Sequence, residues 1–124
     1  MYVGRTFYTT EEILPCKVFL EKALAAYCIS GYEYITDTFD VLDGSFYTWL
    51  SGYSQGNVPE NAVVGGCCTT TGEDIYIGRA DHDKTLTPGK IHPSHNCLYI
   101  PFGGREYKLL HYEVLVRNQA VIGF

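Results

Sequence analysis

Residues 75–79 read Ile-Tyr-Ile-Gly-Arg, and residues 1–5 read Met-Tyr-Val-Gly-Arg, the same pattern 74 positions earlier. A second pair of motifs follows, Leu-Pro-Cys-Lys at 14–17 and Thr-Pro-Gly-Lys at 87–90, now 73 positions apart. Similarity at one nearly constant spacing is the sequence signature of a repeated structural unit. The chain is therefore predicted to contain two copies of one fold.

The offset of 73 residues then holds without a gap to the end of the repeat. The matched positions are Gly31 and Gly104, Glu33 and Glu106, Tyr34 and Tyr107, and the motifs Phe-Asp-Val-Leu at 39–42 and Tyr-Glu-Val-Leu at 112–115. We expect residues 1–42 and 75–115 to superimpose about a pseudo-two-fold axis. The predicted organisation is a single domain over residues 1–124, with repeat one at 1–42 and repeat two at 43–115.

The two predicted repeats differ in what precedes them. The second follows a lead-in that ends Glu-Asn-Ala-Val-Val-Gly-Gly at 60–66, and the first begins at residue 1. A similar sequence, Asn-Gln-Ala-Val-Ile-Gly-Phe, stands at 118–124. Two interpretations stay open: residues 116–124 complete repeat one, or they continue the last strand as an edge.

Within a repeat, the predicted elements are short strands joined by turns. Residues 75–80 and 97–102 are rich in β-branched and aromatic residues, which favour strands, and Gly-Gly at 103–104 is typical of a hairpin turn. Residues 81–87 are polar and are interpreted as a loop that Pro-Gly at 88–89 ends. This pattern predicts an all-β fold, in which two tandem pseudo-two-fold-related repeats of short antiparallel strands form one sandwich-like domain.

Residues 18–29 conflict with that assignment. Their sequence, Val-Phe-Leu-Glu-Lys-Ala-Leu-Ala-Ala-Tyr-Cys-Ile, contains good helix formers and taken alone predicts a helix. The equivalent segment at 91–102 contains Pro93 and strand formers and does not. Because two copies of one fold should share one backbone, we expect a loop followed by a strand in both.

Composition limits the class of protein. The 124 residues are 46% hydrophobic and 19% charged, which is enough apolar sequence for one core. The net charge is −5 and no basic run occurs, so nucleic-acid binding is not expected. No apolar stretch approaches the roughly 20 residues of a membrane span, and the opening residues do not form a signal peptide. The five cysteines, an odd number, are expected to be reduced thiols in a cytoplasmic protein, with release by a non-classical route as an alternative.

No motif of a catalytic or cofactor site is present. The sequence contains neither a Gly-x-Ser-x-Gly elbow nor a phosphate-binding loop. His92, His95 and Cys97 lie close together, but structural zinc sites need four ligands with recognisable spacing. Vicinal Cys67 and Cys68 are interpreted as loop residues rather than a redox centre. We therefore expect a binding protein without metal or other cofactor, and not an enzyme.

Six motifs together resemble the DM-nine domain family. They are Val-Pro-Glu-Asn-Ala at 58–62, Gly-Glu at 72–73, Tyr-Ile-Gly-Arg at 76–79, Pro-Gly-Lys at 88–90, Gly-Gly-Arg-Glu at 103–106 and Tyr-Glu-Val-Leu at 112–115. This repeat also occurs in natterin-type proteins, and its characterised members include a mannose-binding bivalve lectin. The resemblance implies a mainly β tandem pair of repeats, often dimeric, with a sugar pocket in each repeat.

The resemblance also implies which residues bind the sugar. In the family, the lysine of the Pro-Gly-Lys motif and an acidic residue in the preceding glycine-rich loop bind mannose hydroxyls. Lys90 matches that lysine, and Lys17 matches it in the first repeat. The acidic position falls on Cys68 or Thr69 of this chain, so the acid itself is not matched.

A lysine carries three hydrogen-bond donors and no acceptor, so a sugar site around it also needs acceptors. The candidates are Asp81, Asp83, Glu73 and Thr69 for Lys90, and Glu11 and Glu12 for Lys17. The alternative is that each lysine is a solvated charge at a turn. Arg5 and Arg79, which also match between the repeats, are expected to pair with Glu33 and Glu106 inside the fold.

These observations predict a lectin that recognises mannose or a related hexose on glycans and acts as a homodimer in recognition or innate defence. The alternative is an intracellular protein-interaction domain that has lost sugar binding. The Cys-Thr loop favours the interaction domain, and the two retained lysines favour the lectin.

Overall fold

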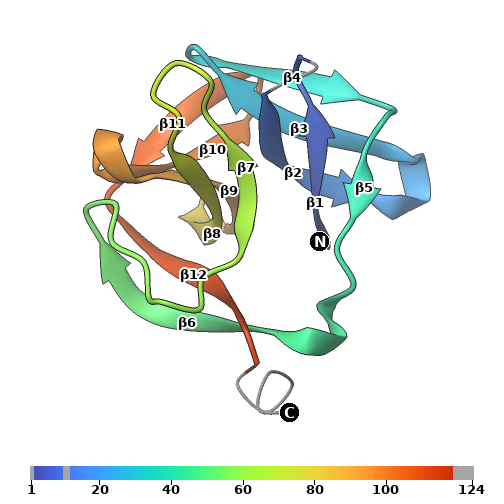
Figure 1. The fold of residues 1–124 in the computed structure, drawn as a ribbon. Helices are drawn as coiled ribbons and strands as arrows, with labels where there is room; N and C mark the ends of the chain where they lie inside the picture. Colours follow the sequence, from blue (N-terminus) through green and yellow to red (C-terminus); the bar gives the residue numbers. More distant parts are fainter. Residues whose placement is uncertain (1, 10–11, 119–124) are drawn as a thin grey trace.

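The computed structural model describes residues 2–9 and 12–118, and these residues form an all-β protein (Figure 1). The strands up to residue 54 are β1 (Tyr2–Phe7), β2 (Ile13–Phe19), β3 (Leu24–Ile29), β4 (Tyr32–Thr36), β5 (Asp40–Val41) and β6 (Tyr47–Ser54). The later strands are β7 (Val64–Cys67), β8 (Asp74–His82), β9 (Thr85–His92), β10 (Cys97–Phe102), β11 (Arg105–Leu109) and β12 (His111–Arg117). Short 3-10 helices lie between strands at η1 (Leu20–Lys22), η2 (Gly44–Phe46) and η3 (Pro93–His95). The predicted all-β class is confirmed.

The strands form one antiparallel sheet that closes into a barrel. Its order is β5-β1-β2-β3-β4-β11-β10-β9-β8-β12-β6. β7 pairs with both β2 and β8, which are far apart in that order, and so it closes the ring. Figure 1 shows β7 between the strands of the two halves. The expected sandwich is not confirmed, because the sheet closes through β7.

The two halves of the barrel have the same plan. β1 to β4 in the first half correspond in order and pairing to β8 to β11 in the second. β5 pairs with β1 through Asp40 and Arg5, and β12 pairs with β8 through Glu113 and Arg79, which are equivalent positions. The halves meet where β4 pairs with β11. The motifs that match in the sequence therefore occupy matching places in the structure.

Residues 18–29 form the end of a strand, a 3-10 turn and a second strand, as the repeat predicts. η1 and η3 lie at equivalent positions, and each ends at a residue in the left-handed conformation, Ala23 (φ 52°) and Asn96 (φ 62°). β3 pairs with both β2 and β4, and this pairing buries Ala25 and Ala26. Tertiary pairing therefore overrides the local helix propensity.

The expected loop at 81–87 is wrong. β8 and β9 continue until only residues 83–84 remain as the turn, with φ values of 47° and 64°. Positive φ at both turn residues is the geometry of a two-residue type I′ hairpin, whose twist suits antiparallel strands. Pro88 and Gly89 therefore lie within β9, and Pro15 likewise lies within β2.

The core consists of two hydrophobic clusters. The larger lies in the second half and includes the completely buried Ile91, Leu98, Ile100 and Val114. The smaller lies in the first half and consists of Cys16, Val18 and Ala25. Gly89 lets β9 approach β10, because a Cβ at this position would lie 2.0 Å from the carbonyl oxygen of Tyr99. The second half is thus closely packed around the strand that carries Lys90.

The C-terminal part of β12 continues the last strand. Val116 and Arg117 pair with β6, and not with a strand of the first half. Residues 119–124 lie outside the part of the chain that the structure describes. Completion of repeat one by this segment stays a prediction.

Candidate functional site

Lys17 and Lys90 are buried between the two halves, with 5% and 6% of their surface exposed. Each lies within a strand, β2 or β9, and neither is at a turn. Lys90 Nζ donates a hydrogen bond to the carbonyl oxygen of Cys28 at 2.8 Å and lies 3.2 Å from Glu106 Oε2. The alternative of a solvated charge at a turn is therefore wrong for both lysines.

The contacts of Lys17 repeat those of Lys90 with the halves exchanged. Lys17 Nζ donates to the carbonyl oxygen of Pro101 and lies 3.2 Å from Glu33 Oε2. Pro101 stands 73 positions after Cys28, the same offset that separates the two lysines. Each lysine thus joins the glutamate of its own repeat to the backbone of the other repeat.

The two glutamates complete this network at the junction of the halves. Glu33 Oε1 accepts a hydrogen bond from the backbone N–H of Gly104, and Glu106 Oε1 accepts one from Gly31, each at 2.9 Å. One carboxylate oxygen of each glutamate is therefore fixed by the backbone of the opposite repeat, and the other oxygen faces the lysine.

The matched arginines are not part of this network. Arg5 lies 3.4 Å from Asp40, and Arg79 lies 2.5 Å from Glu113. The expected pairing of these arginines with the two network glutamates is wrong, because β1 and β8 place them beside β5 and β12.

A cavity of about 410 Å³ opens beside Lys90, within the range of roughly 300–1,000 Å³ typical of small-ligand sites. Both halves contribute to its lining, which consists of Glu12, Leu14, Ile29, Ser30, Cys68, Thr70, Thr71, Ile75, Lys90, His92, His95, Tyr99 and Glu106. Glu106 Oε2 is buried, and no described residue donates a hydrogen bond to it, although Lys90 Nζ lies at ion-pair distance. The cavity therefore contains a buried donor, Lys90 Nζ, beside a buried acceptor, Glu106 Oε2, that receives no hydrogen bond from the described residues.

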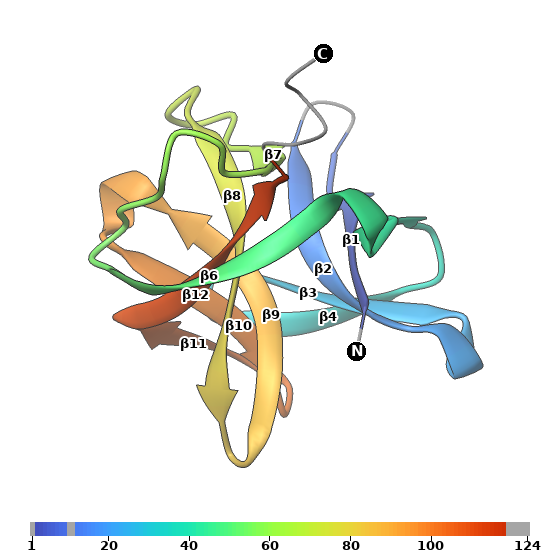
Figure 2. The ribbon, with the colours of Figure 1, turned by 90° about the horizontal axis from the view of Figure 1, so that it is seen from below.

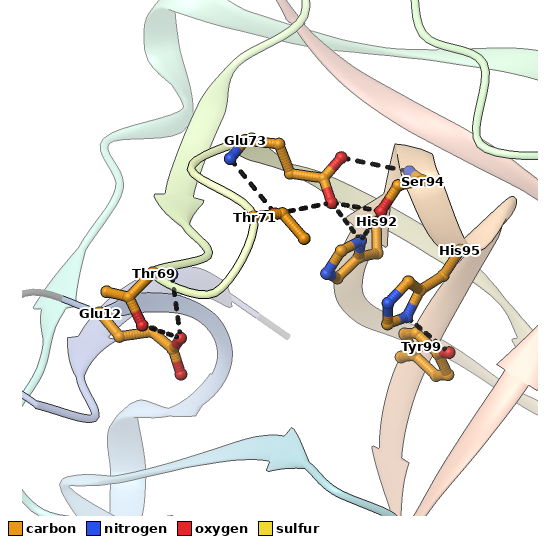
Figure 3. Close-up of polar contacts among 8 residues, drawn as sticks. All are labelled: Glu12, Thr69, Thr71, Glu73, His92, Ser94, His95 and Tyr99. Carbon is orange, nitrogen blue, oxygen red and sulfur yellow. Dashed lines mark hydrogen bonds and ion pairs between the residues drawn. The ribbon is translucent and has the colours of Figure 1, made fainter.

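The loop between β7 and β8 borders the cavity and holds Glu12 (Figure 3). The backbone N–H and the hydroxyl of Thr69 donate to Glu12 Oε1 at 3.2 and 3.1 Å. Glu12 is only 8% exposed and lines the Lys90 cavity. The structure thus assigns it to that cavity and not to Lys17, with which the sequence grouped it. Glu11 lies outside the described residues.

Cys68, one of the two positions expected for the acid, also lines the cavity. Burial acts to raise the pKa of its thiol, but hydrogen bonds from Thr71 and Thr70 outweigh burial and lower that pKa below its ordinary value. Hydrogen bonds to the charged form favour the thiolate. The loop therefore presents a polarised sulfur where the resemblance implies a carboxylate.

Two stacked histidines stand across the cavity from Glu12 (Figure 3). The rings of His92 and His95 have centroids 3.6 Å apart and planes 11° apart, and His95 Nδ1 lies 3.0 Å from the Tyr99 hydroxyl. His92 Nδ1 lies 2.9 Å from Glu73 Oε1. Burial, followed by the charge of His95, lowers the pKa of His92, so at neutral pH the contact with Glu73 is a hydrogen bond from a neutral ring.

The sequence did not indicate this histidine wall as a sugar site. A usable signal was the difference between the repeats. His92 and His95 stand where the first repeat has Phe19 and Lys22, so two imidazole rings replace a phenylalanine and a lysine in the second repeat alone.

Asp81 and Asp83 lie away from Lys90. Lys90 pairs with Ile77 of β8, whereas Asp81 pairs with Leu86, four residues further along the strand or about 13 Å. Asp83 lies in the turn at the tip of the β8–β9 hairpin, which projects from the body of the protein in Figure 2. Neither aspartate lines the cavity. The structure therefore does not bring these candidates together with the lysine.

The surroundings of Lys17 are more apolar than those of Lys90. Its Nζ lies 5.2 Å from the ring centre of Phe102 and 5.8 Å from that of Phe19. The equivalent positions near Lys90 are Ile29 and His92. Lys17 does not line the cavity beside Lys90. The two repeats have thus diverged, and the Lys90 cavity is the candidate site.

A second cavity, of about 560 Å³, lies beside β1, β5 and β7 and has a different character. Its charged pair, Arg5 and Asp40, is 54% and 64% exposed, and the rest of the lining is mostly apolar. Without a buried charged group, this cavity lacks the fixed donors and acceptors of the Lys90 cavity.

Two further findings concern membranes and metals. Within residues 2–9 and 12–118, no helix has the length and apolar character needed to cross a bilayer. In the same part of the chain, no group of three or more His, Cys, Asp or Glu side chains is arranged to hold a metal ion. Cys16, Cys28, Cys68 and Cys97 are free thiols.

The closed barrel and the cavity with its buried ion pair define a small β protein with a site for a polar ligand. The model of the DM9 repeat matches residues 1–109, and the chain belongs to the DM9 repeat family. The chain is similar to Natterin-4 of Thalassophryne nattereri, with 36% identity over 86 residues that make up 69% of this chain and 18% of natterin-4. It is also similar to Natterin-3 of the same organism, with 34% identity over 95 residues, 75% of this chain and 22% of natterin-3. The chain spans about a fifth of the length of these curated relatives, and the family membership suggests a lectin-like, carbohydrate-binding protein.

Proposed function

We propose that the protein is a lectin that binds mannose or a related hexose in the Lys90 cavity. The observation that carries this proposal is the pair of Lys90 Nζ and Glu106 Oε2, 3.2 Å apart in the lining of the cavity. Nζ donates one of its three N–H groups to Cys28 and lies at ion-pair distance from Glu106, so it keeps donors for a ligand. Oε2 accepts no hydrogen bond from the described residues. Two neighbouring sugar hydroxyls could use both atoms, one accepting from Nζ and the other donating to Oε2.

The network behind these atoms favours binding because it fixes them in advance. Cys28 holds the lysine and Gly31 holds the glutamate, so neither side chain must be ordered by the ligand. Each neutral hydrogen bond between a sugar and the protein contributes only about 0.5–1.5 kcal/mol net. A site prepared in this way loses less of that gain to ordering.

The proposal includes one working site for each chain. The Lys17 side has phenylalanine rings where the Lys90 side has an aliphatic and an imidazole group. Useful avidity for glycans would then require several chains in one assembly.

The test must separate loss of binding from loss of folding. Removing Lys90 alone would leave Glu106 buried without its partner, which typically costs about 3–5 kcal/mol. Both members are therefore replaced, as Lys90→Met with Glu106→Gln. The matched control is Lys17→Met with Glu33→Gln, an equivalent buried pair in the other repeat. Titration calorimetry with mannose and other hexoses should show at least roughly tenfold weaker binding for the first variant only.

Two results would count against the proposal. If both folded double variants lose affinity equally, the assignment to the Lys90 cavity is wrong. If the unmodified protein binds none of the hexoses, the lectin itself is wrong.

An intracellular protein-interaction domain is the second candidate. The burial of both lysines in contacts within the protein favours it, because those contacts already give each lysine a structural role. Absence of hexose binding combined with intact folding would favour this candidate.

The proposed lectin acts in recognition or innate defence and carries out no catalysis. The same proposal places it in the cytoplasm with reduced thiols, or outside the cell after non-classical release. Fractionation of cells followed by immunodetection would check the location.

A further inference from the structure

The charges in the lining of the Lys90 cavity do not balance. Among the lining residues that the structure describes, Lys90 is the single lysine or arginine, and Glu12 and Glu106 are carboxylates. Lys90 and Glu106 form an ion pair and offset one another. His92 is neutral at pH 7, because burial lowers its pKa. His95, the other histidine of the lining, contacts the Tyr99 hydroxyl across the cavity from Glu12 (Figure 3). Among the described lining residues, Glu12 is therefore the carboxylate without a cationic contact.

Glu12 is held firmly but not neutralised. Thr69 donates two hydrogen bonds to Oε1, and both donors are uncharged. In the described part of the chain, no lysine, arginine or histidine forms an ion pair with Glu12. A carboxylate has about four acceptor sites over its two oxygens, so the group can accept more than these two bonds. A residue 8% exposed that keeps its charge without a cationic partner is costly unless a ligand compensates it.

A second observation points to a ligand at the same place. Glu106 Oε2 is buried and accepts no hydrogen bond from the residues that the structure describes, and the Glu106 side chain is only 9% exposed. It lines the cavity together with Glu12. The occupant that satisfies both carboxylates must donate hydrogen bonds to Glu106 and bring positive charge to Glu12. Positive charge is less suited to Glu106, because Lys90 Nζ already lies 3.2 Å from it.

We propose that the Lys90 cavity prefers hexosamines with a free amine over neutral hexoses and excludes anionic sugars, with the ammonium group facing Glu12. This inference rests on the proposed function, since the ring hydroxyls still bind Lys90 and Glu106. A hydrogen bond between charged groups is shorter and stronger than a neutral one. The expected preference for the amine is roughly five- to tenfold in affinity.

The experiment compares four sugars of one configuration by titration calorimetry at pH 7: mannose, mannosamine, N-acetylmannosamine and mannuronic acid. An amine with a pKa near 7.7–8.0, as for α-amino groups, is mostly protonated at this pH. Mannosamine should bind more tightly than mannose. N-acetylation removes the charge but keeps the nitrogen, so N-acetylmannosamine should not show the higher affinity of mannosamine. Mannuronic acid should bind more weakly than mannose.

A charge variant assigns the preference to Glu12. Glu12→Gln keeps the size and an acceptor oxygen, and it should bring the affinities for mannosamine and mannose together. Glu21→Gln removes the same charge from an exposed position in η1 and should leave the preference unchanged. If Glu12→Gln does not fold, the four-sugar series on the unmodified protein still decides the question.

The outcomes are distinguishable. Mannose binding without any preference for mannosamine overturns this inference and leaves the proposed function intact. Preference that persists in folded Glu12→Gln also overturns it. Absence of binding for all four sugars overturns the proposed function and this inference together.

Discussion

Cys68 is the cavity residue whose chemistry can be followed directly. The thiolate is the reactive form of cysteine, and the lowered pKa of Cys68 keeps it a thiolate to lower pH than an ordinary cysteine. Burial, together with Asp40, raises the pKa of Cys16 to about 12, and burial also raises that of Cys28. We predict that iodoacetamide at pH 7 modifies Cys68 in the native protein and leaves Cys16 and Cys28 unmodified, as read by peptide mass spectrometry.

The hydrogen bonds to the sulfur provide the control. Thr71→Val removes a hydroxyl that also contacts Glu73 and that contributes to the lowered pKa of Cys68, so it should slow modification of Cys68 at pH 7 without affecting the buried thiols. A bound sugar should also slow it, since Cys68 lines the cavity. Faster labelling of Cys16 than of Cys68 would contradict the assignment.

At the scale of the element, the turn after η1 places an alanine in a backbone conformation that is unfavourable for it. Ala23 adopts a left-handed conformation, with φ 52°, whereas its equivalent is an asparagine, with φ 62°. The left-handed region costs most residues roughly 1–2 kcal/mol, which glycine avoids and asparagine partly avoids. We predict that Ala23→Gly raises the free energy of unfolding by about 1 kcal/mol, and that Asn96→Ala lowers it. Urea denaturation measures both, and destabilisation by Ala23→Gly would be the contrary result.

The same elements show what the sequence could predict. The repeat correctly excluded an α-helix over residues 18–29 and placed a strand at their end, because the equivalent segment contains Pro93 and strand formers. The prolines before the lysines misled the interpretation, since proline was taken as the end of a loop. β3 begins to pair with β2 only at Lys17, so Pro15 is not needed as a donor in that ladder. Pro15 does pair with Arg5 of β1, and a proline is compatible with a strand where its nitrogen does not have to donate.

The candidate site was predicted only in part, because its contacts also depend on the tertiary fold. The matched lysines were recognised from the repeat, but their partners depend on contacts across the barrel. Cys28 and Pro101 contribute carbonyl oxygens, which carry no signal in the side-chain sequence. Glu12 reaches the second-repeat cavity because β7 brings Thr69 beside it, and this closure is a property of the tertiary fold.

On the scale of the whole molecule, the two halves differ in one strand. β7 pairs with β2 at Ile13 and with β8 at Tyr76. The equivalent positions in the other half are Leu86 and Tyr2, which are 41% and 55% exposed. Among the described strands, β1 pairs with β2 and β5. Within residues 2–9 and 12–118, no strand therefore occupies the position equivalent to β7, and an unpaired strand edge favours pairing with another chain.

We predict that residues 119–124 of a second copy fill this position and make the protein a homodimer. Their sequence matches the lead-in to β7, with Ile122 at the place of Val64. Light scattering should give a dimer for the full chain and a monomer for a chain that ends at Asn118. Ile122→Lys should act like the truncation, because a charged side chain is costly to bury at a strand interface, whereas Gln119→Ser should remain dimeric. A full chain that is monomeric, or a dimer that survives both the truncation and Ile122→Lys, would show that this segment does not join two copies.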